Sequence, residues 1–264
     1  MKQSRESPAG GRVLLTFQTA EAAPDLLSTA VALARSLPAQ LSGLFIEDID
    51  LLRLAALPFT REVGGASGTV RAIDLPEVER TLKRQAEHAR QSLANVAQKL
   101  QLPWSFEVTR GTLLDEVLAA AAADFVVTGR ARSVARSIGP GSMAASGEQL
   151  VLALFDASDA GFRALTAALH LAHGRPELLS LLVPSNGVKG RNEIEQLAAN
   201  WLGVPMGSTR MQLVSSPVAP VLARHTRGER RSRALVLPGS SLPDARRQLR
   251  VLLDTSECPL VVVR

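Results

Sequence analysis

Short apolar runs alternate with longer amphipathic stretches along the whole chain. Apolar runs of strand length occupy residues 12–18, 40–47, 104–109, 124–128, 150–156, 177–183, 209–214, 234–237 and 259–263. Between these runs, apolar residues recur at steps of three and four, which is the spacing of one helical face. The clearest example reads Leu75, Val78, Leu82, Ala86, Ala89, Leu93, Val96 and Leu100. This order predicts strands that alternate with helices.

Several of the predicted strands are apolar at nearly every position, which is typical of strands that are buried on both faces. Helices are expected at residues 26–37, 75–100, 112–121, 160–173, 192–202, 218–225 and 246–253. Alternation of this kind favours a parallel sheet with helices on both sides. We therefore predict an α/β fold built from open, three-layer, Rossmann-like units.

The chain runs through this plan twice. The strand at 12–18 and the helix after it resemble residues 150–156 and the helix that follows them, and Ala123–Gly129 resembles Ala234–Gly239. Internal repetition predicts two homologous units, at 12–146 and 147–264, after a disordered N-terminus at 1–11. The first unit has room for only four strands, because seven residues alone, 143–149, separate its last loop from the next strand.

The missing fifth strand leaves one edge of the first unit without a partner. An open edge strand invites pairing with another strand. We expect the two halves to pack as an intramolecular pseudo-dimer, with this edge covered by the other half or by a second chain in a homodimer.

Composition narrows the class of protein without naming a function. The 264 residues are 46% hydrophobic and carry a formal net charge of +5. Cys258 is the single cysteine, so no intramolecular disulfide can form and a reducing cytoplasm is expected. No run approaches 18 apolar residues and residues 1–11 are polar, so we expect neither a membrane span nor a secretory signal.

Three segments carry a family resemblance. Asp156-Ala-Ser158 opens a helix that continues with Ala167 and Ala168, Asp124-Phe-Val-Val-Thr-Gly129 forms a strand, and the last strand reads Glu257-Cys-Pro-Leu-Val-Val-Val263. Together they resemble the universal stress protein family in a tandem form. The resemblance covers residues 11–264 apart from 48–73. It implies two units of the adenine nucleotide alpha hydrolase-like type and a role in the stress response.

Family members that bind ATP carry an aspartate after the first strand and a loop Gly-x2-Gly-x9-Gly-Ser or Thr after the fourth. Closely spaced glycines and a helix N-terminus there bring backbone amides to phosphate oxygens. In the first half, Gln18 holds the aspartate position, Arg132 replaces the second glycine, and Gly141-Ser142 stands one residue early. In the second half Asp156 is present, but no glycine follows Gly239. Both motifs are degenerate.

The resemblance makes ATP or AMP the candidate ligand. The candidate binding residues are Gly129, Arg130, Arg132, Gly139, Gly141 and Ser142 in the first half, with Asp156 and Gly239 in the second. One interpretation is an altered anion site in the first half, with glycine amides as donors and Arg130, Arg132 or Arg136 supplying charge. In the other interpretation ATP binding has been lost and the loops only connect strands.

Further arginines gather near the ends of predicted elements. They are Arg246, Arg247 and Arg250, and then Arg224, Arg227, Arg230, Arg231 and Arg233. Cations near the carboxyl ends of parallel strands would meet an anionic ligand. Aromatic residues make up only 3% of the chain, so platforms for base stacking are scarce and we do not expect nucleic acid as a partner.

Catalytic residues form no complete set. His88, His170, His173 and His225 lie on different predicted elements or lack a third ligand, so we expect no metal site. Nothing beside Cys258 would activate it as a nucleophile. We expect a stress-linked binding or regulatory protein and no enzyme. The alternatives are a nucleotide-hydrolysing enzyme of the same superfamily and a polyanion-binding module with an Arg-rich surface.

An insertion at 48–73 distinguishes the first half from the second. Leu51, Leu54, Ala55 and Leu57 have helical spacing, and glycines follow at 64, 65 and 68. The segment leaves the end of the second strand, next to the expected ligand crevice. It is either a lid or partner-binding helix (48–63), or a helix that packs its leucine face over the crevice and fills it.

Overall fold

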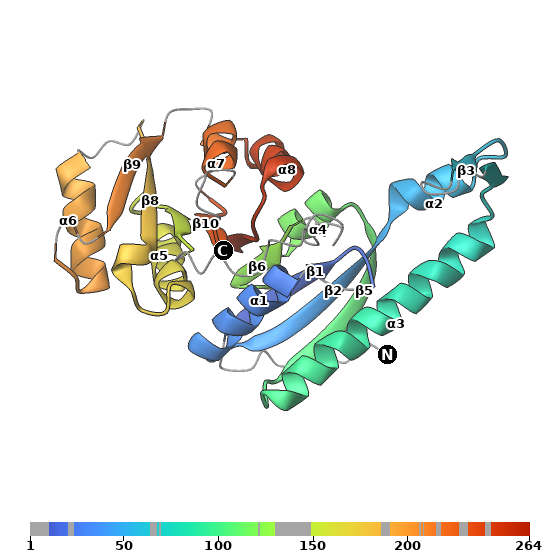
Figure 1. Cartoon of the computed structure of the whole chain (residues 1–264), viewed down its shortest axis with the longest axis horizontal. Helices are drawn as coiled ribbons and strands as arrows, with labels where there is room; N and C mark the ends of the chain where they lie inside the picture. Colours follow the sequence, from blue (N-terminus) through green and yellow to red (C-terminus); the bar gives the residue numbers. More distant parts are fainter. Residues whose placement is uncertain are drawn as a thin grey trace.

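A computed structural model describes residues 11–20, 24–63, 68, 70–120, 122–129, 149–185, 191–205, 207, 209–214, 218–226, 232–240 and 244–264. Its main sheet contains β1 (Arg12–Phe17), β2 (Gln40–Asp48), β5 (Trp104–Gly111), β6 (Phe125–Thr128), β7 (Val151–Leu154), β8 (Leu179–Pro184), β9 (Arg210–Val214), β10 (Ala234–Pro238) and β11 (Leu260–Val263). These nine strands lie in the order β5-β2-β1-β6-β11-β10-β7-β8-β9 (Figure 1). The α/β class expected from the sequence is confirmed.

Neighbouring strands are parallel everywhere except at one pair. β6 and β11 are antiparallel, with Phe125 opposite Val263 and Thr128 opposite Leu260. The strands from β1 to β6, which we call the first half, therefore point opposite to those from β7 to β11, the second half. The edge that lacked a partner strand is covered by β11 of the same chain.

Helices cover both faces of the sheet. They are α1 (Pro24–Ser36), α2 (Ile49–Ala55), α3 (Leu75–Lys99), α4 (Leu113–Ala119), α5 (Asp159–Leu171), α6 (Arg191–Leu202), α7 (Val218–Thr226) and α8 (Ala245–Thr255). The buried side chains of α1, α3, α5 and α6 pack on one face of the sheet, and those of α4, α7 and α8 on the other. The result is the expected three-layer arrangement.

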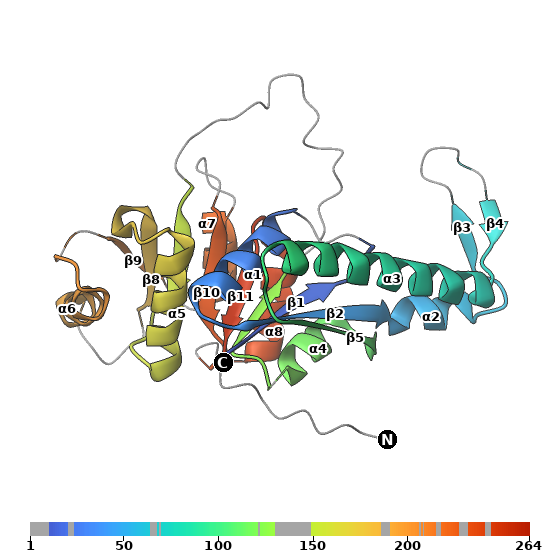
Figure 2. The same ribbon diagram turned by 90° about the horizontal axis from the view of Figure 1, so that it is seen from below.

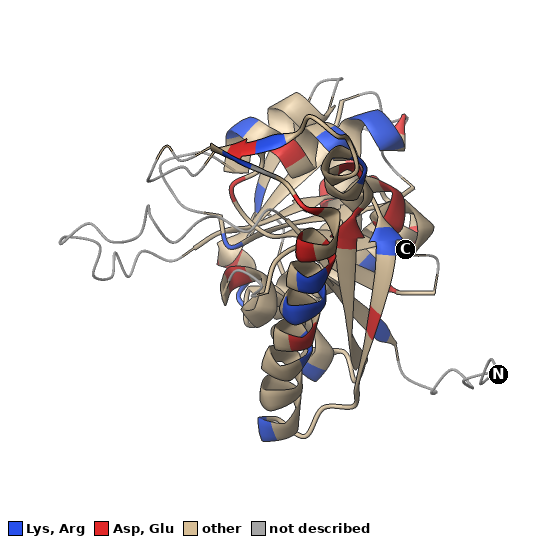
Figure 3. Ribbon diagram, turned by 90° about the vertical axis from the view of Figure 1, so that its right-hand side faces the viewer, with Lys and Arg blue, Asp and Glu red and all other residues tan. Residues whose placement is uncertain are grey.

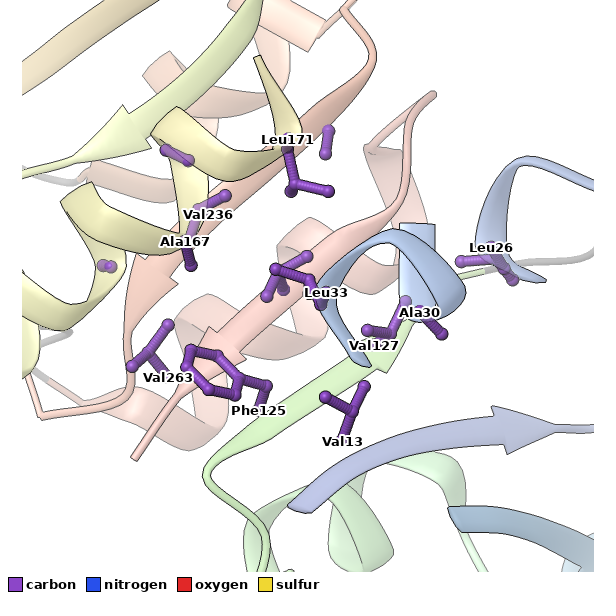
Figure 4. Close-up of a cluster of buried hydrophobic side chains, with 14 of the residues drawn as sticks. Val13, Leu26, Ala30, Leu33, Phe125, Val127, Ala167, Leu171, Val236 and Val263 are labelled. Atoms are coloured by element: carbon purple, nitrogen blue, oxygen red, sulfur yellow. The ribbon is translucent and has the colours of Figure 1, made fainter. Parts of the chain in front are cut away.

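The hydrophobic core runs without interruption across the β6–β11 junction. Helix α1 of the first half packs against α5 of the second, so Leu33 and Phe125 lie near Ala167 and Val263 (Figure 4). On the other face α4 packs against α8, and the Arg264 guanidinium donates a 3.0 Å hydrogen bond to the carbonyl of Leu118 at the end of α4. The halves therefore share one core.

The long helix α3 presents a charged, solvated outer face. Acidic and basic residues are interspersed along the helices at this end of the molecule (Figure 3). On α3 itself Arg90 and Glu87 form an ion pair of 2.7 Å. Hydrogen bonds from Arg90 and Gln91 lower the pKa of Glu87 to about 2. These two charges thus neutralise each other on the outer face of α3.

The insertion forms an arm that extends from the body of the molecule. Asp48 caps α2 by accepting hydrogen bonds from the amides of Asp50 and Leu51, and the hairpin β3 (Arg61–Val63) and β4 (Val70–Ala72) follows. Figures 1 and 2 show α2 and the hairpin beside the outer end of α3. Helix α2 packs on α3 and β5, with Leu52 and Ala55 buried. The interpretation in which its leucine face fills the crevice is therefore wrong.

Candidate functional site

The order of the strands defines two crevices where a ligand is expected. In the first half β1, β2 and β5 follow one another outward, whereas β6 lies on the other side of β1. In the second half β7, β8 and β9 run outward and β10 lies on the other side of β7. Ligands of open α/β sheets bind at such switch points, outside the carboxyl ends of the strands. Because β6 and β11 are antiparallel, the strands of the two halves point in opposite directions. The carboxyl ends, and with them the two crevices, therefore lie at opposite ends of the strands.

The first crevice lies between the ends of β1 and β6. Gly129 follows β6, and a side chain added there would place its Cβ 3.2 Å from Cδ2 of Leu26 in the first turn of α1. Beneath it, the buried hydroxyl of Thr16 donates to that of Thr128 over 3.0 Å and ties the strand ends together. Gly129 is thus where predicted. Arg130, Arg132, Arg136, Gly139, Gly141 and Ser142 lie outside the described residues.

The second crevice contains Asp156, which lies two residues before Ser158, the N-cap of α5. Its Oδ1 accepts hydrogen bonds from the amide (3.0 Å) and the hydroxyl (2.7 Å) of Ser158. Ser158 is the N-cap of α5 and accepts from the amide of Gly161 over 3.0 Å. A Cβ on Gly161 would collide with Asp156 Oδ1. Gly161 therefore allows Asp156 to fold back onto the helix start.

Gly239 lies at the same end of the adjacent strand. Val236 pairs with Ala153, so Gly239 and Asp156 each stand three residues beyond paired positions. The amide of Gly239 donates to the carbonyl of Val263 over 2.7 Å. Asp159 adds a further carboxylate in the first turn of α5. The structure brings Asp156 and Gly239 to one crevice. The described groups there are two carboxylates, which repel a phosphate, and the amide of Gly239, which already donates to Val263.

Arg246 and Arg250 of α8 lie toward Asp115 of α4, in the other half of the molecule. Arg246 forms a 2.7 Å ion pair with Asp115 of α4. The pKa of Asp115 is lowered, first by the hydrogen bond from the Thr112 hydroxyl and then by the charge of Arg246, with a smaller contribution from Arg250. Arg246 thus connects α8 to α4.

The remaining candidates for chemistry are dispersed. Among the described residues no group of three His, Cys, Asp or Glu side chains could hold a metal ion. Cys258 is 8% exposed. Within the same residues, none of the helices combines the length and apolar character that crossing a membrane requires.

Sequence reasoning missed a cavity of about 460 Å³ at the amino ends of β7, β8 and β9. It is lined by Leu150, Leu152, Ser180, Arg210, Met211, Gln212, Arg224, His225 and Ser232. The available signal was the placement of Arg210 and Gln212 two residues apart, on one face of a strand. Arg224 was noted with its neighbours in sequence, but not with Arg210.

Comparisons with known proteins found similar solved structures but no match in sequence. Neither a family model nor a curated protein matches the sequence. A universal stress protein from Archaeoglobus fulgidus is similar over 95% of this chain and 96% of its own, with 11% identity and a TM-score of 0.49. A functionally unknown protein from Pseudomonas aeruginosa is similar over 97% and 92%, with 12% identity and a TM-score of 0.48.

A third structure is a universal stress protein in complex with cAMP. It matches 44% of this chain and 97% of its own, with 18% identity and a TM-score of 0.31. These likenesses concern the arrangement of strands and helices, and at such identities they assign no ligand. The class that the structure itself defines is an α/β protein with a mostly parallel sheet between two layers of helices.

Proposed function

We propose that this chain is a non-enzymatic, stress-linked regulatory protein that acts by binding another protein through its arm, residues 49–63 and 70–72. The observation that carries the proposal is the apolar surface of the arm. Phe59 is 91% exposed. The other large apolar side chains exposed on the arm are Leu51, Leu54, Leu57, Val63 and Val70. Contiguous exposed apolar surface marks interaction sites in soluble proteins.

The arm is held in shape by its own contacts. The Thr60 hydroxyl donates to the carbonyl of Leu54 over 2.8 Å. Arg71 of β4 pairs with Glu62 of β3 at 3.0 Å and with Glu77 of α3 at 3.4 Å. A surface that is already ordered loses less conformational entropy when a partner binds. Burial of each leucine or phenylalanine would then contribute about 1.5–3 kcal/mol.

A nucleotide, if one regulates this binding, belongs to the first crevice. Asp156 is engaged by Ser158, and the amide of Gly239 by Val263, so the second crevice suits phosphate poorly. The proposal therefore includes at most a degenerate adenine-nucleotide site beside Gly129. ATP turnover that disappears in Gly129→Val would favour a nucleotide-hydrolysing enzyme instead.

Photo-crosslinking in cells under stress tests the proposal. A photoreactive phenylalanine analogue replaces Phe59, and a matched analogue replaces Trp201 of α6, an exposed aromatic outside the arm. We expect one defined adduct from position 59 and none of that size from position 201. Leu54→Ser with Leu57→Ser should reduce the adduct by about a hundredfold or more, because burial of both leucines is lost. Repeating the experiment on purified components with millimolar Mg-ATP, in the original chain and in Gly129→Val, tests regulation by nucleotide.

Two results would contradict the proposal. One is equal, diffuse labelling from positions 59 and 201. The other is an adduct that survives the two leucine substitutions unchanged. Circular dichroism of the variants serves as the folding control, since Leu54 and Leu57 are exposed and their replacement should leave the fold intact.

A further inference from the structure

The cavity at the amino ends of β7, β8 and β9 lies away from the second crevice, which opens at the carboxyl ends of the same strands. Its volume of about 460 Å³ is within the range of small-molecule sites in proteins. Leu150, Leu152 and Met211 supply an apolar lining. The polar lining comes from Ser180, Arg210, Gln212, Arg224, His225 and Ser232.

The described lining carries positive charge and no carboxylate. Arg210 stands on β9 and Arg224 in the last turn of α7, and within the described part of the chain neither forms an ion pair. The ring of His225 is held between two oxygens, with Nδ1 2.7 Å from the carbonyl of Val221 and Nε2 2.8 Å from Oε1 of Gln212. Two guanidinium groups without acidic partners on one cavity make an attractive site for an anion.

Ser180 adds a hydroxyl to the lining of the cavity. The residue is 8% exposed. A serine hydroxyl donates one hydrogen bond, so Ser180 offers a donor to a ligand oxygen in the cavity.

In the first half, the side chains at the corresponding strand positions form hydrogen bonds and an ion pair with one another. By strand register, Arg12 and Ser42 correspond to Leu150 and Ser180: Asp124 donates its amide to the Arg12 carbonyl as Arg233 does to that of Leu150. There, Arg12 Nε donates to Ser42 Oγ over 2.9 Å, and the guanidinium reaches Glu107 at 3.5 Å. A second hydroxyl, that of Ser105, lies 2.9 Å from Ser42.

Three differences between the halves remove these contacts from the second half. Leu150 replaces the arginine that covers the serine, and Gln212 stands where the first half has Glu107. Arg210 replaces Ser105. The serine is kept, the carboxylate is lost, and cations now line the space.

We infer that this cavity binds a small phosphorylated molecule. Its phosphate lies between Arg210 and Arg224 and accepts a hydrogen bond from Ser180, while its organic part rests on the leucines and Met211. Charge-assisted hydrogen bonds from arginine suit phosphate oxygens in geometry and in strength. The position of Arg224 in the last turn of α7 also complements the helix dipole, but that does not explain Arg210 on the strand.

Calorimetric titration of the full chain tests the inference with three probes: inorganic phosphate, pyrophosphate and phenyl phosphate. Phenyl phosphate should bind more tightly than inorganic phosphate, because its ring covers the apolar lining. Arg210→Gln and Arg224→Gln should each weaken binding by about tenfold, the loss of one charge-assisted hydrogen bond. Arg84→Gln, which removes an exposed arginine of α3 outside the cavity, is the charge-matched control and should bind as the original chain does.

A graft from the first half provides the sharpest variant. Leu150→Arg with Gln212→Glu recreates the arginine that covers the serine and its carboxylate, and should abolish binding without lowering the midpoint of thermal unfolding. Gln212→Glu alone keeps the shape of the side chain and should weaken binding by about tenfold through charge. Failure of all probes to bind at 10 mM, taken as roughly the weak limit of specific affinity, would overturn the inference. So would binding that the two arginine substitutions and the graft leave unchanged.

Discussion

In the first half, Arg12 crosses Ser42 to reach Glu107; in the second, the corresponding positions hold Leu150, Ser180 and Gln212. The backbone register is the same in both halves. In the first half, the arginine contacts both the hydroxyl and the carboxylate. In the second half, the cavity is lined by Arg210 and Arg224, which form no ion pair among the described residues. The two halves thus have the same strand register here but differ in how their polar side chains are paired.

The two halves also differ in what lies after their second strand. In the first half the chain leaves β2 through the arm and returns along the 25 residues of α3. In the second, it leaves β8 and returns along the 12 residues of α6. The exposed features of the two halves therefore differ: an apolar arm in one, and a cavity lined by two arginines in the other. Side chains of both halves pack in one hydrophobic core.

The largest expected effect comes from breaking the junction between the halves. Val261 and Val127 face each other across β11 and β6, and both are fully buried. Val261→Asp would bury a charge without a partner and should lower the free energy of unfolding by about 4 kcal/mol or more. Val63→Asp on the exposed arm is the matched control, and its effect should stay within about 0.5 kcal/mol.

The chain contains one tryptophan in each half, which makes the junction's role measurable. Trp104 reports on the first half and Trp201 on the second, in single-tryptophan variants made with Trp201→Phe or Trp104→Phe. With the junction intact, both fluorescence transitions in urea should coincide, as one cooperative unit requires. Separate transitions in the chain without Val261→Asp would show that the halves unfold independently.

Much of the fold follows from the apolar pattern. The strands at 40–47 and 124–128 and the helix at 75–100 lie within a residue or two of their predicted bounds, because burial on both faces and a helical stripe leave clear signals. The pairing of β6 with β11 could not be chosen from the sequence. An apolar strand does not specify which neighbour it will have, so the sequence favoured packing of the two halves within one chain without identifying the strand that pairs with β6.

The candidate sites were predicted less well, for a different reason. Asp156 was correctly placed after a strand. The hydrogen bonds that it accepts from Ser158, the N-cap of α5, depend on the missing side chain of Gly161, and a ligand motif does not encode that contact. The cavity is built from Leu150, Ser180, Arg210 and Arg224, which are far apart in sequence. Only the register of three adjacent strands and the end of α7 brings them together.

A smaller effect is expected at the start of α5, where the second crevice differs from the first. Gly161→Ala places a methyl group against Asp156 Oδ1, so the two bonds from Ser158 must break or shift. Loss of this cap costs about 1–2 kcal/mol, offset by about 1 kcal/mol from the better helix former, so a net loss of about 1 kcal/mol or less is expected. Urea unfolding measures it.

A double variant separates the collision with Asp156 from the effect that replacing a glycine has on the helix. Asp156→Ala with Gly161→Ala removes the colliding carboxylate, so adding Gly161→Ala to Asp156→Ala should be neutral or stabilising. Equal effects of Gly161→Ala in both backgrounds would refute the idea that Gly161 serves Asp156.

The smallest effect is a pH dependence at the contact between α4 and α8, where one half binds the other. The pKa of Asp115 lies below its ordinary value of 3.8, because Thr112 donates a hydrogen bond to it and Arg246 lies beside it. The unfolded chain therefore binds this proton more readily, so the contribution of Asp115 to stability is complete above about pH 4 and is lost as the pH falls through the lowered pKa. The free energy of unfolding of Asp115→Asn should differ from that of the original chain at neutral pH and approach it in acid.

Two further variants separate the causes of the lowered pKa. Since the hydrogen bond from Thr112 is the larger cause, Thr112→Val should remove more of the pH-dependent stability than Arg246→Gln does. Salt should weaken only the part that is due to the charge of the arginine. Urea unfolding at a series of pH values measures both, and the reverse order of the two variants would mean that the charge of α8, not the cap of α4, holds this carboxylate.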